Sequence, residues 1–207
     1  MNPLITILTY VYPIICVFVP CIVYQIILQK KENSSERLHK GNFVWRYVFI
    51  LYLYLVMSIV GIGTIWEIGS YGPVIRTEEI HLLPFQSEGL FTYAMNALMF
   101  MPLGFLLPLL WEKYRSFPKT ILLGFLFSLS IEIGQLFSRR QTDIDDLLMN
   151  VLGTALGFCA WLLFHKLFKT KPRDLYAFRD EPLMYLCLSV LGIFLLHHWQ
   201  RLLTFAE

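Results

Sequence analysis

The chain has 207 residues, of which 57% are hydrophobic, 16% aromatic and only 15% charged. This composition is too apolar for an ordinary soluble domain and is typical of an integral membrane protein. The formal net charge is only +2, and the 17 Lys and Arg residues cluster between the apolar segments, which is unlike a nucleic-acid-binding surface.

Five apolar segments are long enough to cross a bilayer, because about 20 residues of helix span about 30 Å of hydrocarbon. A sixth segment, residues 182–204, is weaker because the polar run HHWQR at 197–201 interrupts it. It either crosses the membrane or lies at the surface, with Trp199 and Arg201 among the headgroups. The sequence therefore predicts an all-α, polytopic helix bundle that forms one membrane domain over residues 1–207. The predicted spans are residues 4–28, 43–66, 91–111, 120–138 and 146–168.

Positive charge distinguishes the two sides of the predicted bundle. The connections after spans one, three and five carry thirteen of the 17 Lys and Arg residues, and the remaining four are Arg76, Arg139, Arg140 and Arg201. Because Lys and Arg are retained in cytoplasmic loops, we expect the N-terminus outside, and the C-terminus as well if the sixth segment crosses. The connection between spans two and three and the connection between spans four and five then face outside.

The segment IEIGQLFSRRQTDIDDLLMN, residues 131–150, is unusually polar for a chain of this composition. It covers the end of span four, an outer connection and the start of span five. At a rise of about 1.5 Å per residue, Glu132 lies about 10 Å below Arg139, and Gln135 is one turn nearer the surface. An ionisable residue at this depth is costly and by default marks a functional site.

Span five presents a second polar face. Asp143, Asp146 and Asn150 are spaced at i, i+3 and i+7, which places them on one side of a helix. Asn150 is expected about 6 Å below Asp146, near the depth of Glu132 on the antiparallel neighbour. Span three adds Asn96 about one turn below its outer end.

We expect these side chains to form one ligand-binding pocket in the outer leaflet, because helix packing alone would not require them to share a depth and a side. The pocket is predicted to contain Asn96, Glu132, Gln135, Asp146 and Asn150, with Arg140 and Asp143 at its rim.

Each member of this set also has a purely structural interpretation. Glu132 could pair with a neighbouring arginine, and the two asparagines could join adjacent helices by hydrogen bonds. The aspartates could supply negative charge to a helix N-terminus, which is the interpretation we prefer for Asp145.

The other notable residues of the chain are more typical of structural roles than of a second functional site. Gly153 and Gly157 in span five form a small-xxx-small pattern that lets another helix approach closely. The four cysteines lie in apolar runs without metal-ligand spacing. His197 and His198 are adjacent, so they point to different helix faces, whereas His81 lies in an outer connection and could border the pocket. No metal site and no cofactor is therefore predicted.

Four motifs follow one another along the chain: HLLPF, NALMFMPLGF, IEIGQLF and RRQTDIDDLLMNVLGTALG. In this order they resemble the VanZ-like family of bacterial membrane proteins, over a core region of residues 81–157. His81 departs from the family pattern, in which an asparagine is more usual, and spans one and six lie outside the resemblance. The family's recurrent positions fall here on Asn96, Pro102, Gly104, Glu132, Gln135, Arg140, Asp143, Asp146, Asn150, Gly153 and Gly157.

The family name derives from low-level resistance to teicoplanin, a glycopeptide antibiotic with a lipid tail. The resemblance therefore implies a multi-pass protein of a Gram-positive bacterial cell membrane. It does not supply a biochemical mechanism, because one fold can host several functions.

Two functions from different classes fit the predicted pocket. In the first, the protein is a binding protein for a membrane lipid, a lipid-linked cell-wall precursor or a lipid-tailed glycopeptide, and binding changes how much drug reaches its target. In the second, it is a membrane-embedded enzyme that modifies a lipid-linked envelope molecule, with Glu132 and Asp146 in acid–base roles or holding a divalent cation. The sequence favours binding, because it offers no nucleophile beside a base. A transporter would more typically show internal repeats.

The predicted orientation can be tested by chemical labelling. A cysteine introduced at Gln141 is expected to react with a membrane-impermeant thiol reagent on intact cells, whereas a cysteine at Ser34 is expected to react only after lysis. The asymmetric distribution of Lys and Arg is the physical reason. Labelling of intact cells at Ser34 alone would invert the orientation and place the polar residues in the cytoplasmic leaflet.

Overall fold

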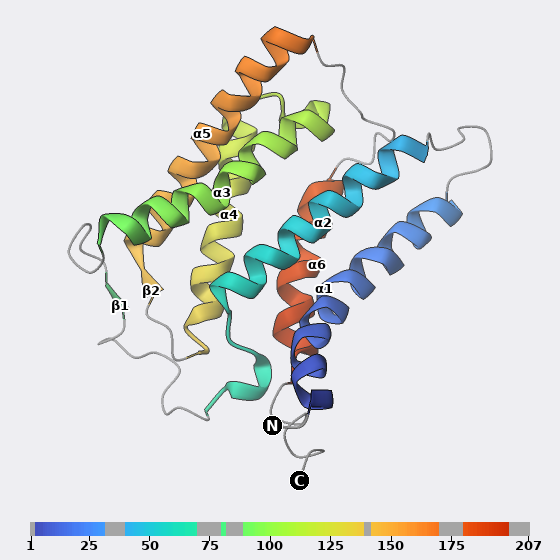
Figure 1. Ribbon diagram of the computed structural model, residues 1–207, viewed down its shortest axis with the longest axis vertical. Helices are drawn as coiled ribbons and strands as arrows, with labels where there is room; N and C mark the ends of the chain where they lie inside the picture. Colours follow the sequence, from blue (N-terminus) through green and yellow to red (C-terminus); the bar gives the residue numbers. More distant parts are fainter. Residues whose placement is uncertain are drawn as a thin grey trace. The chain divides into compact units, whose positions relative to one another are not determined.

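A computed structural model of the chain describes residues 3–31, 40–69, 80–81, 89–138, 142–169 and 180–198. Within these residues, five helices are long and apolar enough to cross a membrane, as predicted. The all-α prediction is confirmed, since the described strands are two residues long. The long helices are α1 (Pro3–Lys31), α2 (Lys40–Val60), α3 (Leu90–Leu110), α4 (Phe117–Gln135) and α5 (Ile144–Phe168) (Figure 1).

The sixth helix is shorter than the predicted span. α6 (Glu181–Leu196) has 16 residues, which correspond to about 24 Å of helix. It ends before the polar run that begins at His197, where the backbone leaves the helix and the carbonyl of Leu196 accepts a 2.5 Å hydrogen bond from the Tyr12 hydroxyl. The predicted continuation to residue 204 lies partly outside the described residues.

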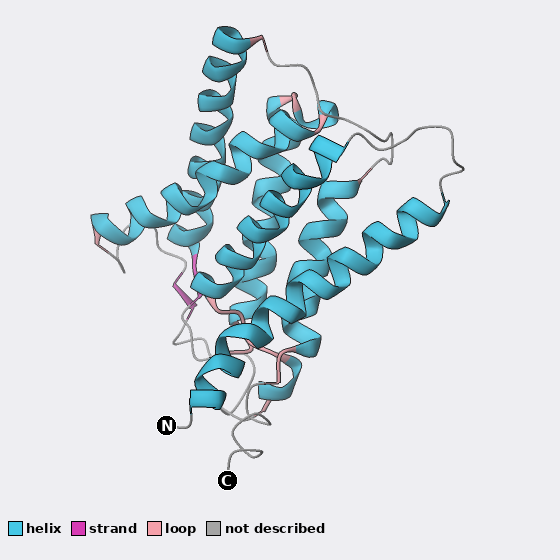
Figure 2. Cartoon of the chain, turned by 45° about the vertical axis from the view of Figure 1, so that its right-hand side comes forward, coloured by secondary structure: helices cyan, strands magenta, loops and turns pink. Residues whose placement is uncertain are grey.

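Short elements occupy the connections. Single turns of 3-10 helix form at η1 (Ile65–Glu67) and η3 (Glu112–Tyr114). Two short strands, β1 (Ile80–His81) and β2 (Thr142–Asp143), pair in parallel, with His81 opposite Asp143 (Figure 2). The backbone before α3 is thereby joined to the backbone that starts α5.

The chain divides into two compact units. Unit 1 contains α1, α2 and residues 183–196 of α6, and unit 2 contains β1, α3, α4, β2 and α5. The expectation of a single membrane domain over residues 1–207 stays a prediction. All described members of the predicted pocket belong to unit 2.

Unit 1 is built around Tyr185 of α6, which is fully buried. Its hydroxyl accepts a 3.0 Å hydrogen bond from Gln25 of α1, and its ring lies 6.4 Å from that of Phe49 on α2. Gly192 lies against α1 so closely that a Cβ there would come 2.1 Å from the carbonyl oxygen of Cys16. α6 therefore packs directly on both of its partners in this unit.

The end of α6 is held by aromatic and polar contacts. The Trp66 indole donates a 3.2 Å hydrogen bond to the carbonyl of Leu195, and its ring stacks on His198 at 4.5 Å. Burial lowers the pKa of His197 from its ordinary value, and the Glu67 carboxylate opposes this shift. His197 is therefore neutral in the fold at neutral pH.

Unit 2 depends on a close crossing of α3 and α5. A Cβ on Gly153 would lie 2.0 Å from the carbonyl oxygen of Ala97, and one on Gly157 would lie 2.0 Å from that of Met101. On the opposite helix, a Cβ on Gly104 would lie 1.9 Å from the carbonyl oxygen of Thr154. The close approach predicted from the small-xxx-small pattern is confirmed, and it is a contact between backbones.

One side of α5 packs against the other helices of the unit, and the opposite side is apolar and exposed. Asn150, Gly153 and Gly157 are buried, so the polar and small residues face the other helices of the unit. The opposite side carries exposed leucines, as a lipid-facing surface requires. These are Leu148, Leu152, Leu156 and Leu163.

Because the two backbones are in contact, even a small side chain in place of Gly157 is expected to destabilise the protein. Gly157→Val is expected to destabilise the protein by about 1–3 kcal/mol or more, because overpacking here pushes against a carbonyl that cannot rotate away. Thermal unfolding of the purified protein in detergent measures the change. The control is Leu156→Val on the exposed side, expected within about 0.5 kcal/mol of wild type. Equal stability of the two variants would contradict the close crossing.

Candidate functional site

The candidate site lies where α5 begins. Asp143 is the N-cap residue of α5, and its carboxylate accepts a 2.9 Å hydrogen bond from the backbone N–H of Asp145. Aspartate is favoured at this position because it satisfies an N–H that the helix leaves without a partner. Asp145 and Asp146 occupy the first turn, where the helix dipole also favours negative charge. Local chemistry thus explains why acidic residues gather at this point.

Glu132 joins the end of α4 to this cap. Its carboxylate accepts a 3.3 Å hydrogen bond from the backbone N–H of Asp143, and its side chain is 5% exposed. Asp143 therefore bonds to both helices: its carboxylate accepts from α5, and its backbone N–H donates to Glu132 of α4.

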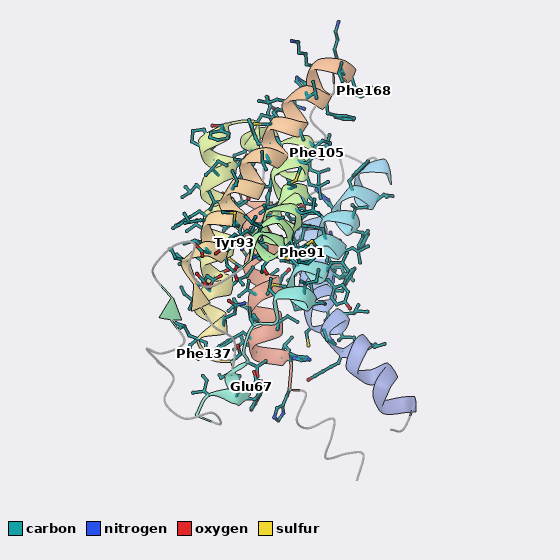
Figure 3. The ribbon with its side chains drawn as sticks, turned by 60° about the vertical axis from the view of Figure 1, so that its left-hand side comes forward. Glu67, Phe91, Tyr93, Phe105, Phe137 and Phe168 are labelled. Carbon is teal, nitrogen blue, oxygen red and sulfur yellow. The ribbon has the colours of Figure 1, made fainter. Side chains whose placement is uncertain are left out.

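α3 contributes two side chains that reach the first turn of α5. The Tyr93 hydroxyl donates a 2.8 Å hydrogen bond to the carboxylate of Asp145, which is fully buried. The side-chain amide of Asn96 donates to the carboxylate of Asp146. Figure 3 labels Tyr93 among the side chains of this unit. Both bonds cross from helix to helix, so they also stabilise the packing of α3 on α5.

Asn150 lies deeper and bonds to a different helix. Its amide donates a 2.9 Å hydrogen bond to the hydroxyl of Ser128 on α4, and Thr154 donates a 2.9 Å hydrogen bond to the Asn150 carbonyl. We expected Asn150 near the depth of Glu132, whereas its partner is one turn further from the end of α4. The difference arises because Glu132 is level with the cap residue Asp143, before the first turn of α5.

The predicted residues differ in how accessible they are. Glu132, Gln135, Asp143 and Asn150 are buried, and Gln135 is the last residue of α4. Asn96 and Asp146 are half-buried, so they form the accessible edge of the cluster. Arg140, predicted at the rim, lies outside the described residues.

Three residues of the cluster were missed or undervalued by sequence reasoning. Asp145 was interpreted only as a helix N-terminal charge, but it is buried and bonded to Tyr93. Tyr93 lies three residues before Asn96, and Ser128 lies four residues before Glu132, so each shares a helix face with a predicted member. That spacing is the signal by which both could have been found.

The arrangement is rich in hydrogen-bond acceptors. Glu132, Asp143, Asp145 and Asp146 are brought together by hydrogen bonds at the start of α5. Among the described residues, no group of three or more His, Cys, Asp and Glu side chains could hold a metal ion. A ligand group suited to the accessible edge would offer hydroxyl, amide or amine donors.

The VanZ/LLP1 family model matches residues 15–165 of the chain. The chain belongs to the VanZ/LLP1 family. The matched region includes the core of residues 81–157 and extends back into α1, which the motif resemblance did not cover. Searches of curated proteins and of solved structures returned no match. With its apolar helices, membership of this family makes the chain a multi-pass membrane protein.

The contact between Asn150 and Ser128 can be tested with two neighbouring serines. Ser128→Ala removes the acceptor of a buried amide and is expected to destabilise the protein by about 1–3 kcal/mol. The Ser130 hydroxyl donates a 2.6 Å hydrogen bond to the carbonyl of Phe127 in its own helix. Ser130→Ala is therefore the control, expected within about 0.5 kcal/mol of wild type. Chemical or thermal unfolding in detergent gives both values. Equal effects would show that Asn150 does not depend on this bond.

Proposed function

We propose that this member of the VanZ/LLP1 family binds a lipid-linked component of the cell envelope, or a lipid-tailed glycopeptide, at the outer leaflet of a bacterial cell membrane. Binding would confer low-level resistance to antibiotics of the teicoplanin type. The site would be the cluster of Asn96, Glu132, Gln135, Arg140, Asp143, Asp146 and Asn150.

One observation carries this proposal: acidic side chains are collected at a single point of an apolar unit. Glu132 and Asp143 come from opposite sides of the outer connection, and Asn96 meets Asp146 from a third helix. Helix capping accounts for Asp143, but it does not account for a buried glutamate at the end of α4. Ionisable groups within membrane segments most often serve a ligand or transport path.

The accessible edge suggests how a ligand would be held. Asn96 and Asp146 are half-buried. Asn96 presents a side-chain amide and Asp146 presents a carboxylate, so the pair can both donate and accept hydrogen bonds. The buried members behind them hold that edge in place, as supporting residues do in preorganised sites. A headgroup with donors would lie at the edge, and its acyl chain would lie in the bilayer along exposed leucines such as Leu148.

The second candidate is an enzyme that modifies a lipid-linked envelope molecule. It is favoured by the hydrogen bond from the backbone N–H of Asp143 to Glu132, which brings the Glu132 carboxylate to the acidic start of α5. Two carboxylates beside one substrate can divide acid and base roles. Such an enzyme would change the chemical composition of the envelope precursor, which a binding protein would leave unaltered.

Antibiotics that differ only in their lipid tails separate these functions. Cells with the protein are expected to be protected against a lipid-tailed glycopeptide and only weakly against a tail-less one with the same peptide-binding core. An acyl chain anchored in the outer leaflet is what brings the drug to the site. The measurement is susceptibility to the matched pair, with mass spectrometry of cell-wall precursors. Equal protection against both antibiotics, together with a new precursor mass, would contradict the binding function and support the enzyme.

Within the same assay, Glu132→Gln tests the site itself. The amide oxygen can still accept the N–H of Asp143, so the protein should reach normal abundance, while the loss of charge should abolish protection. Glu112→Gln, an exposed carboxylate in η3, is the control and should protect as wild type does. Full protection by Glu132→Gln at normal abundance would remove Glu132 from the site, and reduced abundance would identify a structural ion pair.

A further inference from the structure

Side chains from two other elements of unit 1 cap the end of α6. A helix leaves its last carbonyl groups without partners inside the helix, and α6 stops at Leu196. The Trp66 indole of η1 donates a 3.2 Å hydrogen bond to the carbonyl of Leu195. The Tyr12 hydroxyl of α1 donates a 2.5 Å hydrogen bond to the carbonyl of Leu196. Two aromatic donors therefore fasten the last turn of α6 to α1 and η1.

A histidine lies against each of these aromatic donors. The ring centroid of His197 is 5.4 Å from that of Tyr12. The ring centroid of His198 is 4.5 Å from that of Trp66. The backbone N–H of His198 also donates a 3.4 Å hydrogen bond to the Tyr12 hydroxyl, which therefore bonds to the residues on both sides of His197. We name Tyr12, Trp66, His197 and His198 the histidine cluster.

Burial and one nearby carboxylate act on His197 in opposite directions. The ring is half-buried, and this burial lowers its pKa from the ordinary value more than the Glu67 carboxylate raises it. The Glu67 carboxylate is fixed by its own turn, because it accepts a 2.7 Å hydrogen bond from the backbone N–H of Thr64 (Figure 3 labels Glu67). The other titratable groups described beside His197 are the Tyr12 hydroxyl and the His198 ring. A charged His197 ring is therefore less favourable in this cluster than a neutral one.

The direction of this pKa shift sets the pH at which the cluster is stable. The ordinary pKa of histidine is about 6.5, and the pKa of His197 in the fold is lower. The contribution of His197 to stability is therefore complete above about pH 6.5 and is lost as the pH falls from there through the lower pKa of the folded state. Below that range, the favoured state is one in which the protonated ring is hydrated. A hydrated His197 ring no longer covers Tyr12, so water competes for the hydroxyl that holds Leu196.

We propose that the histidine cluster is a pH-sensitive latch, which holds the end of α6 to α1 and η1 at neutral pH and releases it in a mildly acidic medium. Protonation of His197 moves its ring into water, and loss of the Tyr12 hydrogen bond then frees the last carbonyls of α6. The predicted orientation places this end of unit 1 outside the cell, where it meets the pH of the medium. The latch belongs to unit 1, so it does not rest on the ligand site proposed in unit 2.

Hydrogen–deuterium exchange at the end of α6 tests the latch. The full-length protein is purified in neutral detergent, which makes the result independent of the predicted orientation. Exchange is followed by mass spectrometry for the peptide that contains His197, whose N–H bonds to the carbonyl of Ile193 at 3.1 Å. Rates at about pH 7.5 and about pH 5, above and below the ordinary histidine pKa, are each divided by the rate for an unfolded peptide. The α6 peptide is expected to lose at least about twofold in protection at the lower pH, and a peptide from the middle of α5 is expected to keep its protection.

Two variants are expected to change the pH dependence in opposite directions. His197→Gln keeps a polar side chain that does not titrate, so protection of the α6 end should be equal at the two pH values. Glu67→Gln keeps an oxygen that can accept the N–H of Thr64 and removes the charge that favours protonation within the cluster. Its loss of protection at the lower pH should therefore exceed that of the wild type. A purely structural role of either residue would instead change protection equally at both pH values.

His165→Gln is the matched control. His165 is also a half-buried histidine stacked on an aromatic ring, with its centroid 5.3 Å from that of Trp161 in unit 2. The variant keeps His197 and should show the wild-type pH dependence at the end of α6. The same loss of pH dependence in His165→Gln and His197→Gln would overturn the latch.

Two outcomes for the wild-type protein would overturn the proposal, whether or not a variant folds. Equal protection of the α6 end at the two pH values would show that protonation of His197 does not release it. An equal loss of protection in every helix at the lower pH would mean acid unfolding of the whole protein instead of a local release.

Discussion

The contact between the backbones of α3 and α5 is the constraint on which unit 2 depends. Apolar side chains give no driving force for helix association within lipid, so close packing and interhelical hydrogen bonds must hold the helices together. Gly153 and Gly157 allow the crossing, and it places Tyr93 and Asn96 within reach of the first turn of α5. A larger side chain at the crossing would separate the helices and stretch both of those bonds at once.

Asp143 couples the end of α4 to the start of α5. Its carboxylate caps α5, while its backbone N–H bonds to Glu132 at the end of α4. A displacement of this one residue therefore breaks the cap and leaves a buried glutamate with one hydrogen bond fewer. Asp146, where we propose that a ligand binds, lies on the same short segment, so ligand binding there would be linked to stability.

The lengths of the apolar segments were sufficient to predict the long helices. The apolar runs identified the five long helices to within a few residues, and the glycine spacing of α5 predicted its close contact, because each depends on local sequence alone. The level of Asn150 and the role of Asp145 were not foreseen. Both depend on which residue caps α5 and on how α3 crosses it, and these are tertiary relations that one-dimensional spacing does not contain.

Two helices differ from the thickness of the bilayer in opposite directions. α5 has 25 residues and α6 has 16, which correspond to about 38 Å and about 24 Å, whereas the hydrocarbon core is about 30 Å thick. A long helix is accommodated by tilting or by thicker lipid, and a short one by local thinning. Longer acyl chains in the host membrane should therefore relieve mismatch along α5, whereas α6 would need locally thinner lipid to cross the membrane.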